Sequence, residues 1–404
     1  MRYIQTTSDL QNLANRLMDQ PRVALDTEFV WERTFYPILG LVQMALADGT
    51  CHLIDTVAVP DLSPLASMLA DPKIEKILHD APQDLMILTR ASGAPARHVF
   101  DTRLAAGFAG LDSQTSLQNL LAVLLDVQLP KGQTRTDWTA RPLSPEQVDY
   151  AIDDVRHMIR ATDLLREKAR AAGVEAWLDE ELVELYDKAE YRDAPPENAY
   201  TRIRAAMFMP PRHLAALREL AAWRERTARE ADLPRGFVAT DHELVSVAQA
   251  LPVTEAGLAA CRQVDPRVAR RRGPDLLAAV QRGLSLSETD WPKSMAQPDE
   301  QQVGKGRIQA LQAVIRQKAE ARLIDARMVA TKADVIRLLV ADSEAGARPE
   351  DHRLLRGWRA ELLGPCNTTG ATGALRGCGS AGETLDLRYE HRSFRFQGLG
   401  LFPK

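Results

Sequence analysis

The chain has 404 residues, of which 45% are hydrophobic, and a formal net charge of −4. We expect two or three domains from this length, and no apolar run is long enough for a transmembrane helix. The start of the chain lacks the apolar segment of a secretory signal. The four cysteines are scattered, which argues against a zinc site and a disulfide framework. We therefore expect a reducing cytoplasm.

The charge is distributed unevenly along the chain. Residues 1–200 hold 19 Lys and Arg against 31 Asp and Glu, and the remaining residues hold 32 against 24. An acidic domain could act on a polyanion if cations neutralise its site and a basic domain holds the ligand. The alternative is a drift in surface composition without functional meaning.

Apolar patterning predicts four strands in the first 80 residues, at 23–29, 41–46, 51–55 and 73–78. Asp48-Gly49, between the second and third of them, is typical of a hairpin turn. From Pro82 onward the apolar spacing becomes helical. Strands followed by helices indicate an α/β layer with a mixed sheet.

A marked helix start follows at residues 144–147. Ser144 is the expected N-cap, Pro145 suits the first helical position, and Gln147 completes a capping box. We expect this helix to run to about Ala172, just before Gly173.

The second half is helical and repeats itself. The sequence Val-Ala-Thr at 238–240 returns at 329–331, and each threonine is followed three positions later by an acid, Glu243 or Asp334. This pattern predicts two related helical domains, each with an N-capped helix. After residue 363 the composition turns to Gly, Ser and Thr without apolar periodicity, so we expect disorder from 365 to 404.

Asp26 and Glu28 lie two residues apart in the first predicted strand, so their side chains point to the same face. They could be a solvent-facing pair on an edge strand. The apolar residues around them, including Leu25 and Phe29, instead predict burial, and a buried unpaired carboxylate is costly. A bound cation would resolve that conflict.

Two other segments offer carboxylates. Asp84 lies at a predicted helix start, where it could simply complement the helix dipole. Tyr150 and Asp154 are four residues apart on the capped helix and share a face, although the tyrosine could pack in the core and the aspartate could pair with an arginine. Asp153 points about 100° away, so we favour Asp154 over it.

Together these segments supply four hard oxygen ligands, Asp26, Glu28, Asp84 and Asp154, which suit Mg²⁺ or Mn²⁺ and not zinc. Two such ions about 4 Å apart can activate a water and stabilise the leaving oxyanion of a phosphodiester. Tyr150 would orient the attacking water. We therefore predict a two-metal nuclease.

These motifs resemble the ribonuclease D family, in the tyrosine-bearing (DEDDy) branch of the DEDD exonuclease superfamily. The residues that carry the resemblance are Asp26-x-Glu28 with residues 33–37 and 41–43, His79-x-Ala81-x-x-Asp84, Tyr150-x-x-x-Asp154, and the segments 131–132, 137–138 and 141–143. It covers about residues 1–170. It implies that Asp26, Glu28, Asp84 and Asp154 bind two metal ions and that Tyr150 assists the nucleophile.

Residues 220–248 and, less closely, those near 300–363 resemble HRDC domains, which RecQ helicases and ribonuclease D share. The resemblance implies a ribonuclease H-like α/β exonuclease domain, with a mixed sheet and flanking helices, followed by two all-α HRDC-like domains. We expect the exonuclease at 1–172, an acidic helix and linker at 173–205, the helical domains at 206–292 and 299–364, and the tail at 365–404.

Five further residues are candidates for RNA contacts. Phe29, Phe35 and Tyr36 could stack on a terminal base, although core packing explains each of them as well. Lys131 and Arg135 could contact phosphates from a Gly-containing loop, and a solvated loop is the alternative.

The leading hypothesis is a 3′→5′ exoribonuclease that releases nucleoside 5′-monophosphates. The resemblance suggests precursor tRNA and other small structured RNAs as substrates. A 3′→5′ DNA exonuclease would use the same carboxylates, because only contacts to the 2′-OH distinguish the substrates, but no helicase P-loop motif is present. A non-catalytic RNA-binding protein is the third hypothesis, and the four intact carboxylates argue against it. The residues indicate no obligate protein partner.

Overall fold

The computed structural model describes residues 1–130, 136–186, 191, 193–293, 303–343 and 352–364, together with three short strands between 367 and 386. Lys131 and Arg135, two of the predicted RNA contacts, lie outside these residues. The chain divides into two compact units. The first comprises residues 1–100, 129–159 and 185–297, and the second comprises 101–128, 160–184 and 298–404.

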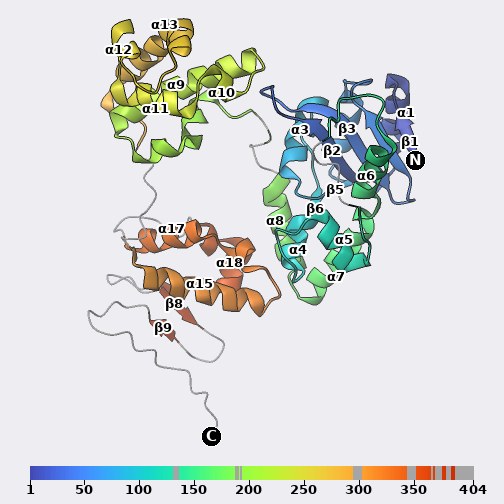
Figure 1. The fold of residues 1–404 in the computed structure, drawn as a ribbon. Helices are drawn as coiled ribbons and strands as arrows, with labels where there is room; N and C mark the ends of the chain where they lie inside the picture. The colour runs from blue at the N-terminus through green and yellow to red at the C-terminus, as the bar shows by residue number, and fades with distance from the viewer. Residues whose placement is uncertain are drawn as a thin grey trace. The chain divides into compact units, whose positions relative to one another are not determined.

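A six-stranded sheet in the order β1-β4-β3-β2-β5-β6 forms the centre of the first unit (Figure 1). Its strands are Arg2–Ile4 (β1), Arg22–Val30 (β2), Ile38–Leu46 (β3), Cys51–Asp55 (β4), Glu75–Leu78 (β5) and Val99–Asp101 (β6). The sheet is mixed, because β2 pairs antiparallel with β3 and parallel with β5. The four predicted strands are confirmed, whereas β1 and β6 are too short to show alternation in a sequence.

The first unit's helices around this sheet are Thr7–Leu17 (α1), Ala66–Ala70 (α2) with the 3₁₀ turn Ser63–Leu65 (η1), Pro82–Ser92 (α3) and Pro145–Arg156 (α6). The predicted capping box at Ser144 and Gln147 is present at the start of α6. The helix expected to reach Ala172 is two helices, because α6 ends at Arg156 and Met158–Ala171 (α7) follows. The apolar spacing continues through His157, so the sequence pattern did not reveal this break.

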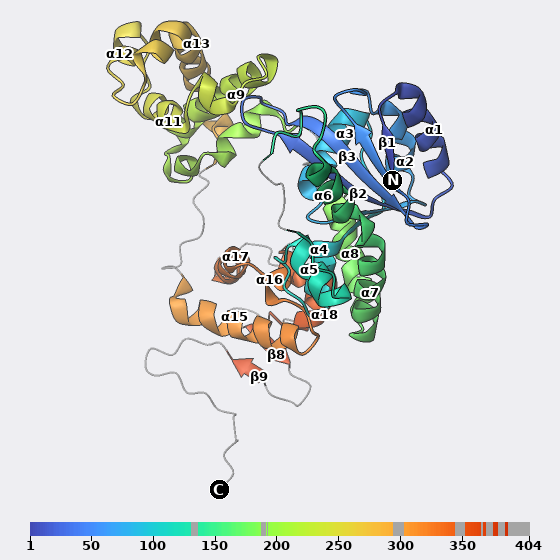
Figure 2. The same ribbon diagram turned by 45° about the vertical axis from the view of Figure 1, so that its right-hand side comes forward.

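A cluster of helices, seen in Figure 2, also belongs to the first unit. It consists of Pro196–Arg202 (η3), Arg204–Phe208 (η4), Pro211–Glu230 (α9), Arg235–Val238 (α10), Asp241–Ala250 (α11), Glu255–Ala259 (α12), Pro266–Leu284 (α13) and Glu288–Asp290 (η5). Phe35, from the loop between β2 and β3, is buried in its apolar core. The Asp232 carboxylate accepts hydrogen bonds from the backbone N–H groups of Phe35 and Tyr36, at 3.0 and 3.2 Å.

The second unit joins helices from both halves of the chain. They are Thr102–Phe108 (α4), Leu117–Leu125 (α5), α7, Glu175–Tyr186 (α8), Lys305–Glu320 (α15), Ala326–Val329 (α16), Lys332–Ser343 (α17), Arg353–Leu355 (η7) and Gly357–Leu363 (α18). Trp358 on α18 is fully buried and contacts Phe108 edge to face, with ring centroids 5.0 Å apart. Arg359 forms an ion pair with Glu181 on α8, at 2.7 Å. Helices predicted within the exonuclease domain therefore pack with the C-terminal helical domain.

The predicted repeat of helix starts is confirmed. Thr240 caps α11, and its side chain forms a capping box with Glu243. At the start of α17 the Asp334 backbone N–H donates to the Thr331 hydroxyl at 3.2 Å, and the Thr331 N–H donates to the Asp334 carboxylate at 2.8 Å. Both acids are buried, so each cap is part of its domain's interior.

Within the tail predicted to be disordered, the structure describes three short antiparallel strands, Asn367–Thr368 (β7), Leu375–Cys378 (β8) and Thr384–Asp386 (β9). The remainder of that tail lies outside the described residues. Among the helices that the structure describes, none is both long and apolar enough to cross a membrane.

Candidate active site

Strand β2 and helix α6 bring three of the predicted carboxylates together. One oxygen from each of Asp26, Glu28 and Asp154 lies within 4.8 Å of the other two. Asp26 and Glu28 share a face of β2 because they are two residues apart, and α6 packs on β2, β3 and β4. Residues 126 or more positions apart in sequence thus form one acidic group.

Asp84 lies next to this group without belonging to it. It is 8% exposed in the first turn of α3, and its charge raises the pKa of both Asp26 and Glu28. Thr27 lies between those two acids on β2, and its hydroxyl donates a hydrogen bond to the Asp84 carboxylate. The first turn of α3 therefore directs a fourth carboxylate toward the site.

Tyr150 lies one turn before Asp154 on α6, and its hydroxyl donates a hydrogen bond to the Asp154 carboxylate. Burial, followed by the charges of Asp154 and Glu28, raises the pKa of Tyr150. Its ring lies 6.0 Å from the buried Trp138 ring, centroid to centroid. The hydroxyl therefore stays protonated at neutral pH and can donate a hydrogen bond.

The acidic group is electrostatically strained without a cation. Burial, with the charges of Asp84, Asp154 and Glu28, raises the pKa of Asp26 well above its usual range. Burial and the charges of Asp154 and Asp84 raise the pKa of Glu28 to about 8. Burial also raises the pKa of Asp154 to about 7, against the opposing hydrogen bond from Tyr150. A divalent cation would offset this repulsion, and the carboxylate oxygens are the ligands that Mg²⁺ and Mn²⁺ prefer.

These pKa shifts predict that the metal-free protein becomes less stable as the pH rises. Glu28 and Asp154 keep protons in the folded state up to about pH 8 and 7, whereas in the unfolded chain they release them near pH 4. The folded state therefore binds more protons between these values, and the free energy of unfolding falls with rising pH. Mn²⁺ replaces those protons, so the gain in Tm on adding Mn²⁺ should be larger at pH 8 than at pH 6. Thermal unfolding in EDTA and in Mn²⁺ measures both, and an equal gain would contradict the prediction.

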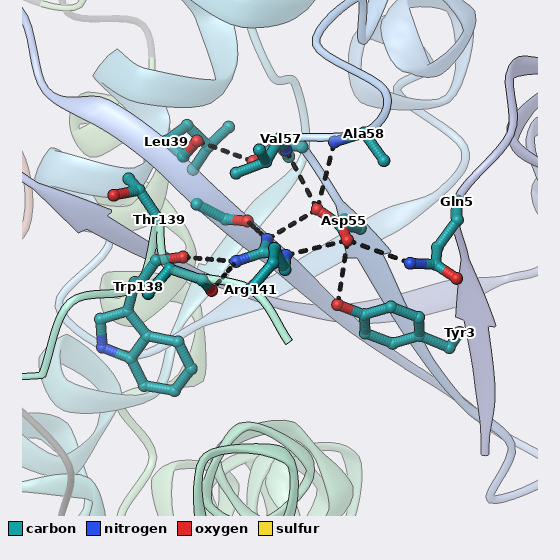
Figure 3. Close-up of polar contacts among 12 residues, drawn as sticks. Tyr3, Gln5, Leu39, Asp55, Val57, Ala58, Trp138, Thr139 and Arg141 are labelled. Atoms are coloured by element: carbon teal, nitrogen blue, oxygen red, sulfur yellow. Dashed lines mark hydrogen bonds and ion pairs between the residues drawn. The ribbon is translucent and has the colours of Figure 1, made fainter. Parts of the chain in front are cut away.

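A polar network anchors the segment that leads into α6 (Figure 3). Arg141 donates to both carboxylate oxygens of Asp55, at 2.6 and 2.9 Å, and to the Gly40 carbonyl at 2.6 Å. The Tyr3 hydroxyl donates to the same carboxylate at 3.1 Å. Gly40 permits this approach, because an added Cβ would lie 2.3 Å from the Trp138 carbonyl oxygen. The network holds residues 138–141 on β3 and β4, and so places the start of α6 over the sheet.

The aromatic candidates for base contacts have different surroundings. Phe35 is 6% exposed and lies in the apolar core of the helical cluster, so it packs in the core and is not available to stack on a base. Phe29 and Tyr36 are half-buried, and the Arg90 guanidinium lies 3.2 Å from the Tyr36 ring centroid. Trp31, which no sequence pattern singled out, is 45% exposed, and its indole N–H donates to the Phe35 carbonyl at 3.1 Å.

Trp31 also lines a pocket of about 200 Å³ in the first unit, together with Glu32, Thr34, Phe35, Pro234 and Arg235. The sequence signal that could have found it is a tryptophan three positions after Glu28, beyond the buried part of the strand.

Comparison with known proteins identifies the family. Residues 1–170 match the family model described as 3′–5′ exonuclease, and residues 213–280 match the HRDC domain. Ribonuclease D of Desulfotalea psychrophila is 37% identical over 360 residues, which cover 89% of this chain and 96% of that protein. The chain belongs to the ribonuclease D family. Ribonuclease D of Escherichia coli K12 is 33% identical over 368 residues, covering 90% of this chain and 96% of the relative.

A solved structure of the same family agrees with the fold. The crystal structure of Escherichia coli RNase D, an exoribonuclease involved in structured RNA processing, matches with a TM-score of 0.78 at 32% identity. The match covers 89% of this chain and 96% of that one. The predicted fold class is confirmed, and the exoribonuclease hypothesis is confirmed over the DNA exonuclease and the non-catalytic RNA-binding protein.

Proposed function

We propose that this 3′→5′ exoribonuclease uses two Mg²⁺ or Mn²⁺ ions to remove nucleoside 5′-monophosphates from the 3′ ends of precursor tRNA and other small structured RNAs. The family supports the activity, the RNA substrate and the need for a metal. The observation that carries the proposal for this site is the approach of Asp26, Glu28 and Asp154 to within 4.8 Å of one another.

The proposed residue roles follow from this geometry. Asp26, Glu28 and Asp154 would hold the cations directly, and Asp84 would serve as the fourth carboxylate from the adjacent helix. Cations bound there would lower the pKa of a water and stabilise the leaving 3′ oxygen. The Tyr150 hydroxyl, which stays protonated, would orient the attacking water by a hydrogen bond.

The direct test is digestion of a precursor tRNA that carries a label within its body and a 3′ extension of known sequence. The proposal expects stepwise shortening from the 3′ end, release of nucleoside 5′-monophosphates, and complete loss of activity in EDTA with recovery in Mn²⁺. A matched DNA oligomer should be degraded much more slowly. Internal cleavage, or activity that persists in EDTA, would overturn the proposal.

We further place the RNA strand near Trp31. The residue follows Glu28 by three positions and lies just past the end of β2 at Val30, so at most about 10 Å of chain separates the two, and base stacking suits an indole face that is open to solvent. Trp31→Ala should raise KM for the tRNA precursor roughly fivefold or more and leave kcat nearly unchanged, because one stacked base contributes about 1–3 kcal/mol.

Two variants control this experiment. Trp31→Phe should keep most of the affinity because it retains an aromatic face. Phe208→Ala removes an aromatic ring that is more exposed than Trp31, at 79% on η4, and should leave KM unchanged. An unchanged KM in Trp31→Ala would exclude a contact between this residue and the RNA.

Two narrower expectations from the sequence remain predictions. These are the location in the cytoplasm and the independence from any protein partner.

A further inference from the structure

Gln43 on β3 is a buried polar side chain whose hydrogen-bonding groups are unused. The residue is 0% exposed. Neither its side-chain nitrogen nor its side-chain oxygen has a hydrogen-bond partner among the residues that the structure describes. Buried amides are nearly always paired, so a fully buried one without partners requires an explanation.

The sheet register shows what lies beside this amide. Gln43 pairs with Asp26 on β2 and with Leu53 on β4. Residues paired across antiparallel strands share a face, with Cβ atoms about 4.5–5.5 Å apart. Its neighbours on the same face of β3 are Leu41 and Ala45. Of these four neighbours, Asp26 alone has a polar side chain.

Helix α6 covers this face of the sheet. It packs on β3, and its Asp154 lies within 4.8 Å of Asp26 and Glu28. The buried residues of α6 are Ala151, Ile152 and Val155, which offer no side-chain hydrogen bond, and Gln147, whose amide is engaged with Ser144 and Thr136 at the start of the helix. Among the described residues that pair with Gln43 or flank it on this face, the one polar side chain therefore belongs to the acidic group.

Fold stability alone would favour an apolar side chain at this position. A buried amide without partners destabilises a protein, and the flanking positions of β3 are apolar. Departures of this kind from the rules of core composition are expected at functional sites. The ionised carboxylate of Asp26 can only accept hydrogen bonds, and an amide can donate one to it without adding charge.

We infer that Gln43 is a positioning residue, whose side-chain amide is hydrogen-bonded through one water to the Asp26 carboxylate and holds it in its cation-binding orientation. This inference rests on the proposed function of the carboxylates. A bond to Asp26 strengthens when that carboxylate is ionised, as cation binding requires. The amide oxygen can accept a hydrogen bond from the same water.

The test is Gln43→Met, which keeps an unbranched side chain of similar length and removes the amide. Calorimetric titration with Mn²⁺ should show an affinity about 10- to 100-fold lower than in the wild type, as is typical when a hydrogen bond to a metal ligand is lost. Thermal unfolding in EDTA should show a Tm equal to or higher than that of the wild type, because an unpaired buried amide has been removed.

Leu53→Met is the matched control. It places the same new side chain on the other side of Gln43, on the same face and at a position that is also 0% exposed. It should leave Mn²⁺ affinity unchanged, whatever it does to Tm.

The outcomes separate the two proposals. If the wild type fails to bind Mn²⁺, the proposed function of the site is wrong. If the wild type binds Mn²⁺ and Gln43→Met binds it equally well, the inference about Gln43 alone is overturned. A lower Tm in EDTA with unchanged Mn²⁺ affinity would assign Gln43 a purely structural role and would overturn the inference as well.

Discussion

Replacing Asp26 by Asn should reduce cleavage of a tRNA precursor by at least about 10²–10³-fold, the loss typical when one electrostatic group is removed from an active site. RNA binding should remain, because Asp26 would bind cations and makes no base contact in the proposed site. The amide of Asn supplies one neutral oxygen in place of a charged carboxylate and cannot balance a divalent cation. Single-turnover cleavage and a binding titration in Ca²⁺ measure the two effects separately.

The same substitution should also change stability in an informative direction. Asp26 is half-buried beside Asp84, Asp154 and Glu28, whose charges raise its pKa. Removing its charge relieves that repulsion, so Asp26→Asn should unfold in EDTA at a Tm no lower than the wild type. Loss of activity would then not be a consequence of misfolding.

Asp153→Asn is the matched control for this experiment. Asp153 is adjacent to Asp154 but pairs with Arg156 at 3.3 Å and lies outside the acidic group. It should keep nearly full activity. Mg²⁺-dependent cleavage that survives in Asp26→Asn would show that the site has been assigned to the wrong residues.

The second large effect is expected from Trp358→Ala in the second unit. Trp358 is fully buried, stacks on Trp177 with ring centroids 5.9 Å apart, and donates its indole N–H to Glu181 at 2.8 Å. Removing a buried tryptophan costs about 3–5 kcal/mol in free energy of unfolding, and here it also leaves a carboxylate with one hydrogen bond fewer.

The loss of stability in Trp358→Ala should also be seen in segments of the second unit that are distant from Trp358 in sequence. Because α4 and α8 pack with α18 in one compact unit, hydrogen exchange should speed up in peptides from 102–108 and 175–186 as well as from 357–363. Peptides from β2 and β3 should keep the protection of the wild type.

Val183→Ala serves as the control on α8 itself. Val183 is 49% exposed, so this change should alter stability by no more than about 0.5 kcal/mol and leave exchange unchanged. If Trp358→Ala accelerates exchange in the C-terminal helices alone, the second unit is not one cooperative body.

Local sequence signals predicted the elements that carry the site. Asp26 and Glu28 share a face because strand geometry alternates, and Ser144 with Gln147 starts α6 because their side chains cap it. These effects act between near neighbours in the chain. The sequence could not reveal Asp55 as the anchor of Arg141, 86 residues away, because local patterns assign Asp55 to the end of a strand and say nothing of which distant side chain meets it.

The boundaries of the compact units also could not be predicted from local sequence signals. The expected order of exonuclease, linker and helical domains assumed that each compact body is one continuous segment. The structure instead groups residues 101–128 and 160–184 with 298–404, and it buries Phe35 in the core of the first helical cluster. Apolar periodicity marks which face of a helix is buried, but does not say which distant segment covers it.

The sequence by itself determined the types of the main elements and the helix caps of the repeated helical domains, and it singled out the carboxylates proposed for the site, because propensity, capping and spacing are local properties. The tertiary structure alone decided that Asp26, Glu28 and Asp154 approach within 4.8 Å, that Gln43 lies buried beside Asp26, and that the chain divides into two discontinuous units. Those features depend on long-range packing, in which the free energy of burial selects among many possible pairings of similar apolar faces.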